Sequence, residues 1–148
     1  MGLFYGLKLV EGPCVVREFT SAATTTYDAG EIVTVTAGSV AIGAAAGLCG
    51  GVALKDAGGV TTMTPIIIIT PEQIWSVCYN GTTALTQIGV DYLMTFTTGA
   101  QCLTSTTTTP TVTVVGLDPR DGAKLYGRLH VKFNQANCLF SGALVAAS

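Results

Sequence analysis

The sequence consists of short apolar runs, many of them β-branched, that are separated by Gly, Asp, Asn and Pro, and it has almost no helical periodicity. Runs of this length that alternate apolar and polar residues are typical of β-strands. The clearest is residues 32–36 (IVTVT), which places Val33 and Val35 on one face of a strand. A turn at residues 37–38 leads into residues 39–42 and predicts a β-hairpin.

Similar runs recur along the chain. Strands are expected over residues 7–10, 15–19, 32–36, 39–42, 52–54, 66–70, 74–79, 92–97, 111–117 and 125–133. About eight to ten short strands at this spacing predict an all-β fold, a single compact β-barrel or sandwich of short antiparallel strands. The run at residues 66–70 (IIIIT) is expected to be buried on both faces. Residues 70–73 (TPEQ) resemble a helix start, but the β-rich residues that follow allow one helical turn at most.

The two ends of the sequence differ from this strand-and-turn pattern. Residues 1–13 carry large apolar groups near their start, and we expect an N-terminal arm that either packs on the barrel or reaches across to a neighbouring molecule. Residues 14–148 are assigned to one β-barrel domain that ends in an apolar C-terminal tail.

Charged residues make up only 11% of the chain and hydrophobic residues 49%. Soluble domains carry roughly 25% charged residues, so this composition favours a surface that is partly buried against partners. The alternative is a monomer whose surface is covered by Thr hydroxyls. The seven Lys and Arg residues are scattered, which argues against a nucleic acid partner. Residues 37–54 lack charge but are mostly small, so no membrane span is expected.

The five cysteines lie far apart in the sequence and form no C-x-x-C motif. With a single His, they do not make up a usual zinc ligand set. An odd number of scattered cysteines favours reduced, buried thiols and therefore synthesis in a reducing cytoplasm.

No residue pattern in the sequence indicates catalysis. His130 is the only His, and alternation places it on a polar strand face with Arg128 and Lys132, where we interpret it as an exposed structural residue. Residues 118–122 (DPRDG) are interpreted as a hairpin loop. Trp75 lies in a β-rich segment and is expected in the core. We therefore predict no enzyme activity and no catalytic, cofactor-binding or metal-ligating residues; carboxylates brought together by the fold remain the enzymatic alternative.

Four segments carry a resemblance to a known family. They are residues 30–35 (GEIVTV), 50–57 (GGVALKDA), 88–93 (IGVDYL) and 114–133, the last with its Asp-Pro and Asp-Gly turn. In these strand-and-turn motifs the chain resembles the capsid decoration (cement) proteins of tailed bacteriophages, of the compact β-barrel kind. The resemblance covers residues 30–133.

This resemblance implies a structural virion component on the outer capsid surface, made in the host cytoplasm. Its partners would be the major capsid protein and further copies of itself, as a dimer or trimer, and many equivalent contacts would supply avidity. The hypothesis places these contacts in the arm and the tail. The residues are Leu3, Phe4, Tyr5, Leu7, Leu139, Phe140 and Leu144. The alternative is a carbohydrate-binding or adhesin-like β-sandwich, which would need an exposed Trp75 or a cluster of Tyr.

Overall fold

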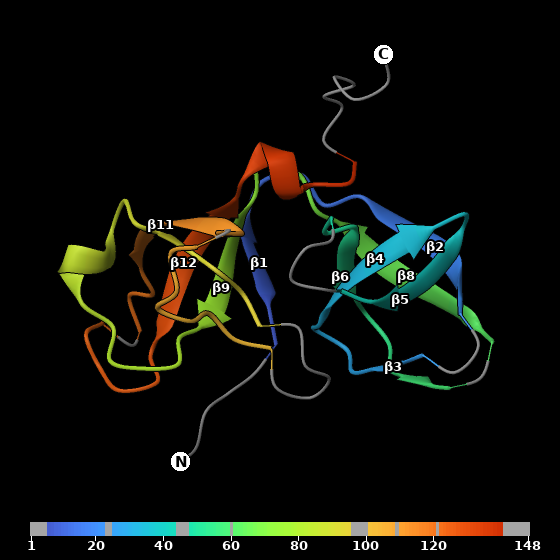
Figure 1. The fold of residues 1–148 in the computed structure, drawn as a ribbon, viewed down its shortest axis with the longest axis horizontal. Helices are drawn as coiled ribbons and strands as arrows, with labels where there is room; N and C mark the ends of the chain where they lie inside the picture. The colour runs from blue at the N-terminus through green and yellow to red at the C-terminus, as the bar shows by residue number, and fades with distance from the viewer. Residues whose placement is uncertain are drawn as a thin grey trace.

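The computed structural model describes residues 6–22, 25–43, 48–59, 61–95, 101–108, 110–120 and 122–140. In this part of the chain the regular structure is almost entirely β, which confirms the all-β prediction. The helical elements there are two short 3-10 turns, η1 (Leu85–Gln87) and η2 (Gln135–Asn137). No helix in the described ranges has the length and apolar character needed to span a membrane. Figure 1 shows that the strands form two lobes side by side.

The first lobe is an open antiparallel sheet of five strands. In spatial order they are β1 (Lys8–Glu11), β9 (Ile74–Cys78), β12 (Arg128–Phe133), β11 (Val112–Leu117) and β10 (Asp91–Tyr92). A β-bulge between Val114 and Gly116 interrupts the β11–β12 register. The loop between these two strands contains residues 118–122, so the predicted hairpin is confirmed.

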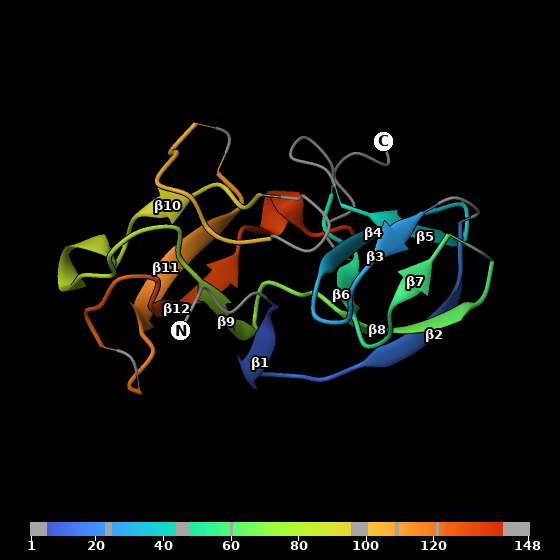
Figure 2. The same ribbon diagram turned by 90° about the horizontal axis from the view of Figure 1, so that it is seen from below.

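The second lobe is a closed five-stranded barrel. Its strands are β2 (Val16–Ser21), β5 (Ser39–Ile42), β4 (Ile32–Thr36), β6 (Gly51–Ala53) and β8 (Met63–Ile68). The barrel closes through a short parallel contact between β2 and β5, which departs from the expected purely antiparallel pairing. A small sheet of β3 (Thr26–Tyr27) and β7 (Ala57–Gly58) lies against the barrel in Figures 1 and 2.

The predicted hairpin at residues 32–42 is present with the expected register. Thr36 faces Ser39 across a two-residue turn, and both turn residues have positive φ, 50° at Ala37 and 83° at Gly38. Two positive φ values are the mark of a type I′ turn, whose twist matches that of the flanking strands. The short-range pattern therefore determined this hairpin.

The buried apolar side chains form two core clusters. The smaller fills the barrel and includes Val33 and Ile66. The larger lies between the lobes, where Trp75 of β9 meets Ile32 and Val52 on the outer face of the barrel. In the isoleucine run, Ile66 and Ile68 belong to the barrel cluster, while Ile69 belongs to the larger cluster and partly buried Ile67 packs against it, which agrees with the burial expected for this run.

Residues 8–11 form the edge strand β1, which confirms the strand expected over residues 7–10 and places this part of the N-terminal segment against the chain's own sheet. β1 pairs with β9, with Lys8 opposite Ser76 and Leu9 opposite Trp75. Leu7 is buried in the larger cluster, and its backbone N–H donates to the carbonyl oxygen of Gly30 at 2.8 Å. The apolar residues around position 7 are thus used within the chain's own fold. Residues 1–5 lie outside the described residues.

The segment that resembled a helix start forms a single turn. Its last residue, Gln73, is fully buried, and its side chain makes four hydrogen bonds. The Nε2 group donates to the carbonyl oxygens of Pro13 and Ile68 at 2.7 and 2.8 Å. The Oε1 atom accepts from the Thr70 backbone N–H at 2.8 Å and from Trp75 Nε1 at 3.0 Å. Gln73 therefore joins the segments that connect the two lobes.

Gly51 permits close packing of β6 between β4 and β8. A Cβ atom at this position would lie 2.5 Å from the carbonyl oxygen of Ile67 and 2.8 Å from Ile66 Cδ1. We expect Gly51→Ala to lower the free energy of unfolding by about 1–3 kcal/mol, because the barrel backbone must shift to admit the methyl group. The control is Gly58→Ala, where no atom lies within 4 Å of the added Cβ. Urea denaturation of both variants measures the difference; equal midpoints would contradict the steric argument.

Candidate functional site

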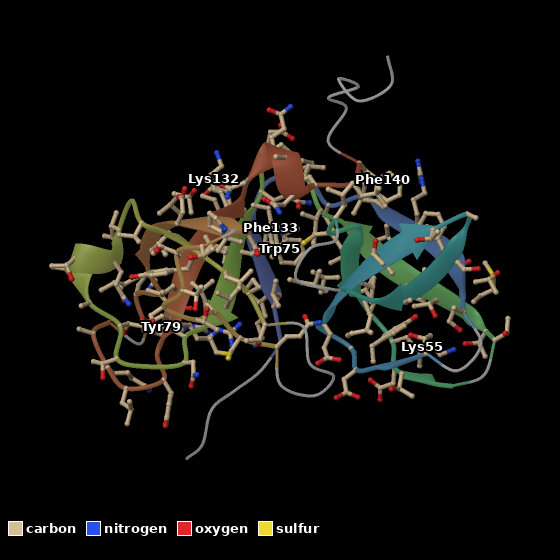
Figure 3. The ribbon with its side chains drawn as sticks, viewed as in Figure 1. Lys55, Trp75, Tyr79, Lys132, Phe133 and Phe140 are labelled. Carbon is tan, nitrogen blue, oxygen red and sulfur yellow. The ribbon has the colours of Figure 1, made fainter. Side chains whose placement is uncertain are left out.

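The outer face of the five-stranded sheet carries the polar side chains that the sequence pattern predicted. His130 lies opposite Ser76 on β9, and Arg128 and Lys132 share its side of β12. The common face is therefore confirmed. Exposure differs from the expectation, however, because the His130 side chain is only 19% exposed and Arg128 is buried. Figure 3 shows Lys132 at the periphery, pointing away from the lobes.

Arg128 is the centre of a buried polar cluster. Its Nε atom donates to Ser76 Oγ at 2.8 Å. One terminal nitrogen donates to the carbonyl oxygens of Ser76 and Gly6, both at 2.6 Å. A buried guanidinium requires such partners, since an unpaired charge in the interior is strongly unfavourable. Arg128 thereby joins β12 and β9 to the chain just before β1.

Asp118 supplies the negative charge of this cluster. Its carboxylate is almost fully buried and accepts from Ser76 Oγ at 3.1 Å, from the Arg120 backbone N–H at 3.0 Å and from the Arg120 guanidinium at 3.3 Å. Burial alone raises the pKa of Asp118, but the hydrogen bonds from Arg120 and Ser76 outweigh burial and lower the pKa to about 2. The carboxylate is therefore ionised throughout the neutral range.

Ser76, His130 and Asp118 are the residue types of a hydrolase triad, but their arrangement is different. In a triad the His lies between the nucleophile and the acid and takes the proton of the Ser. Here the Ser76 hydroxyl bonds to Asp118 and Arg128, while His130 Nε2 lies 3.7 Å from the same Asp118 oxygen. Ser76 is also buried. In this geometry Ser76 joins Asp118 to Arg128 and has a structural role. The arrangement provides no activated nucleophile.

The described residues contain no obvious metal centre. Within those ranges, no three His, Cys, Asp or Glu side chains gather closely enough to hold an ion. Four of the five cysteines are buried, as predicted, and Cys14 is exposed.

The residues proposed for partner contact differ in whether the structure describes them and in how exposed they are. Leu3, Phe4, Tyr5 and Leu144 lie outside the described residues. Leu7 belongs to the core, so the contact role assigned to it is corrected by its burial. Leu139 is half-buried and donates its backbone N–H to the carbonyl oxygen of Cys49 at 2.9 Å. Phe140 is 40% exposed and stacks on Phe19 of β2, with ring centroids 6.2 Å apart. Of the three that the structure describes, Phe140 is the most exposed, and it is labelled in Figure 3.

Sequence reasoning missed four exposed apolar side chains on two segments of the sheet lobe, the one around η1 and the loop between β11 and β12. We call this group the apolar tip, and its members are Leu85, Ile88, Leu125 and Tyr126. Leu85 is 72% and Leu125 58% exposed. Leu85 belongs to η1, the yellow-green coil at the left of Figure 1, and Ile88 follows it, whereas Leu125 and Tyr126 lie in the loop between β11 and β12.

Backbone contacts bring the two segments of the apolar tip together. The Tyr126 N–H donates to the carbonyl oxygen of Gly81 at 2.7 Å, and Thr82 forms a β-bridge with Leu125. Thr83 Oγ1 adds bonds to the carbonyl oxygens of Gly122 and Lys124, at 2.7 and 3.1 Å. These contacts fix the loop that carries Leu125 and Tyr126 against residues 81–83, which lead into η1. No local pattern marked the apolar tip, because the two segments are distant in sequence.

The aromatic residues considered for sugar binding are buried. Trp75 is fully buried and makes an edge contact with Phe133, with ring centroids 6.5 Å apart (Figure 3). Tyr79 and Tyr92 are also buried and pack on each other at 5.8 Å. Sugar platforms need an accessible ring face, and these three residues do not offer one.

Comparison with known proteins identified no relative. No family model matches the chain, and neither the curated proteins nor the solved structures contain a significant match.

Proposed function

We propose that this chain is a structural virion component, a decoration protein that binds the outer surface of a capsid and stabilises contacts between shell subunits. The observation that carries the proposal is the apolar tip, four large exposed apolar side chains on two segments that backbone hydrogen bonds join at residues 81–83 and 124–126. Exposed apolar side chains on backbone segments held by hydrogen bonds are typical of a protein–protein interface.

The distribution of polar groups favours the same function. The polar cluster around Arg128 is closed on itself, with Ser76 and Asp118 occupied by internal hydrogen bonds. A chain with 11% charged residues gains solubility from association when its apolar groups are covered. Repetition around a shell makes modest contacts of this size sufficient, because avidity adds to each of them. The proposal includes a homo-oligomer and the major capsid protein as partners.

The carbohydrate-binding alternative is less well supported. It requires an exposed aromatic platform, whereas Trp75, Tyr79 and Tyr92 are buried. Tyr126 is exposed, but it belongs to the apolar tip, whose other members are aliphatic.

The first test is quantitative mass spectrometry of particles purified from the source of the sequence. We expect a fixed ratio of this chain to the main shell protein, near one or a simple fraction, because a capsid component follows the symmetry of its shell. Absence of the chain from the particles would refute the proposal.

A binding experiment then locates the contact surface. We expect the double variant Leu85→Ser with Leu125→Ser to bind shells lacking the chain at least about tenfold more weakly, since hot-spot side chains carry most interface energy. The matched control is Leu54→Ser with Met63→Ser, which removes two exposed apolar side chains from the barrel lobe. Co-sedimentation with shells measures both. Equal losses in the two variants would contradict a role for the tip.

The same experiment tests the terminal residues. Deletion of residues 1–5 probes Leu3, Phe4 and Tyr5 and leaves β1 in place. Deletion of residues 1–12 removes β1 and Leu7 as well, so it would disturb the fold itself. Full decoration by the shorter deletion would remove the arm from the proposed interface.

A further inference from the structure

Four of the five cysteines, scattered in sequence, form two neighbouring pairs in space. Cys78 at the end of β9 lies beside Cys102, and Cys49 lies beside Cys138. The pairs differ in how their thiols meet, and this difference carries a prediction about their chemistry.

The backbone brings Cys78 and Cys102 to corresponding positions on adjacent parallel stretches. The next residues along each stretch, Tyr79 and Leu103, form a parallel β-bridge. The Leu103 N–H donates to the carbonyl oxygen of Cys78, and the Asn80 N–H to that of Leu103, both at 2.9 Å. Neighbouring strands lie about 4.7–4.9 Å apart, within the Cα separation that a disulfide bridges.

The side chains of this pair also face each other. The Cys78 thiol lies 3.7 Å from the carbonyl oxygen of Gln101, the residue before Cys102, and the two thiols interact closely enough to shift both pKa values. Thr95 Oγ1 approaches Cys102 Sγ from the other side at 3.8 Å. The hydrogen bond from Cys78, with the Thr95 contact, lowers the pKa of Cys102 in spite of burial, and raises that of Cys78. Cys102 is thus the nucleophilic partner, because the thiolate is the reactive form.

The second pair lacks these features. The Cys49 N–H donates to the carbonyl oxygen of Asn137 at 2.7 Å, which places Cys138 beside Cys49. Burial, aided by the neighbouring thiol, raises the pKa of Cys49 to about 12, and burial raises that of Cys138 to about 11. Both thiols stay protonated at neutral pH and are poor nucleophiles.

We propose that Cys78 and Cys102 are a redox site that a small disulfide compound, of the class of oxidised glutathione, converts to an intramolecular disulfide. The Cys102 thiolate attacks one sulfur of the compound and releases one thiolate, forming a mixed disulfide. Cys78 then gives its proton to solvent and attacks Cys102 Sγ, releasing the second thiolate. Two protein thiols are oxidised and one small disulfide is reduced to two thiols.

The bond would close a loop over residues 79–101, which contains η1 and β10. Closing a loop restricts the unfolded chain and therefore stabilises the folded one. We expect oxidation to raise the midpoint of thermal unfolding by roughly 5–10 °C.

The test is oxidation of the native full chain with oxidised glutathione at pH 7.5. Remaining thiols are alkylated in denaturant, and the chain is cut with chymotrypsin, which separates the two cysteines at Tyr79 and Tyr92. We expect a linked pair of peptides containing Cys78 and Cys102, while Cys49 and Cys138 are alkylated. Dithiothreitol should reverse both the link and the shift in melting temperature.

Exposed Cys14 is an internal control, because its conversion to a mixed disulfide shows that the oxidant was active. Cys14→Ser should leave the link intact, and Cys102→Ser should abolish both the link and the thermal shift. Alkylated Cys78 and Cys102 in a wild-type sample whose Cys14 has fully reacted would overturn the proposal. A link between any other two cysteines would overturn it equally, and neither result depends on the folding of a variant.

Discussion

Asp118→Asn is expected to lower the free energy of unfolding by about 2–4 kcal/mol at neutral pH, because it neutralises the carboxylate of a buried ionic cluster. The amide retains an oxygen that accepts from the Arg120 backbone, but its nitrogen is a donor facing the Ser76 hydroxyl and the Arg120 guanidinium. Arg128 would keep its charge in the interior with less compensation.

The pH dependence of stability provides a sharper measurement of the same interaction. The pKa of Asp118 is about 2 in the folded chain and 3.8 in its ordinary state. A lowered pKa means that the stabilisation is fully present above pH 3.8 and is lost as the pH falls toward 2. The difference in unfolding free energy between wild type and Asp118→Asn should therefore shrink from pH 5 to pH 2. Urea denaturation across this range measures it.

Asp91→Asn is the matched control for this experiment. Asp91 is an exposed carboxylate on the same sheet, and it accepts a hydrogen bond from Thr113 Oγ1 at 2.6 Å. Its replacement should change stability by less than about 1 kcal/mol, since water substitutes for the lost interaction. A pH-independent difference for Asp118→Asn would contradict the electrostatic explanation.

Gln73→Met is expected to destabilise the chain by about 3–5 kcal/mol, the largest effect predicted for a single side chain. The four partners of the amide are two carbonyl oxygens, one backbone N–H and the indole N–H. Met fills a similar volume, so the loss arises from buried polar groups without partners, each costing about 1–3 kcal/mol and not strictly additive.

Two other buried glutamines provide a graded comparison for Gln73. Gln101 makes two hydrogen bonds, both to the backbone of Ile32, and Gln87 accepts one from the Ala84 N–H. Thermal and urea unfolding should rank the three Met variants with Gln73 most affected and Gln87 least. A larger effect at Gln87 than at Gln73 would show that bond number does not govern the loss.

Local patterns predicted most of the longer strands, but of the strand expected over residues 92–97 only Tyr92 lies in a described strand, and β3 and β7 were not predicted. The alternation in residues 32–36 and the turn at residues 37–38 fixed β4, β5 and their register, because only neighbouring residues were involved. The polar face of β12 followed from period-two alternation for the same reason. Burial of the isoleucine run was also expected from its composition, although the strand begins earlier, at Met63.

The assembly of the strands did not follow from local patterns. The strand expected over residues 7–10 is present as β1, but nothing in the sequence near it indicates that it pairs with β9 and not with β2. The contact of Ser76 with Asp118 and Arg128 depends on the pairing of distant strands, as does the meeting of Cys78 with Cys102. No spacing of Ser, Asp and Arg along the sequence predicts that their side chains will form such a cluster.

The position of the barrel strands between β1 and β9 in the chain has a kinetic consequence. During synthesis β2 to β8 emerge together, whereas β1 must wait for β9 before it can enter a sheet. Pairings between distant strands form slowly because the loop must close first. In the interval the outer wall of the barrel, with Ile32 and Val52, stands open to water. A chain that has not yet formed the β1–β9 pair is therefore prone to aggregate. The rate at which this pair forms then governs the yield of folded protein.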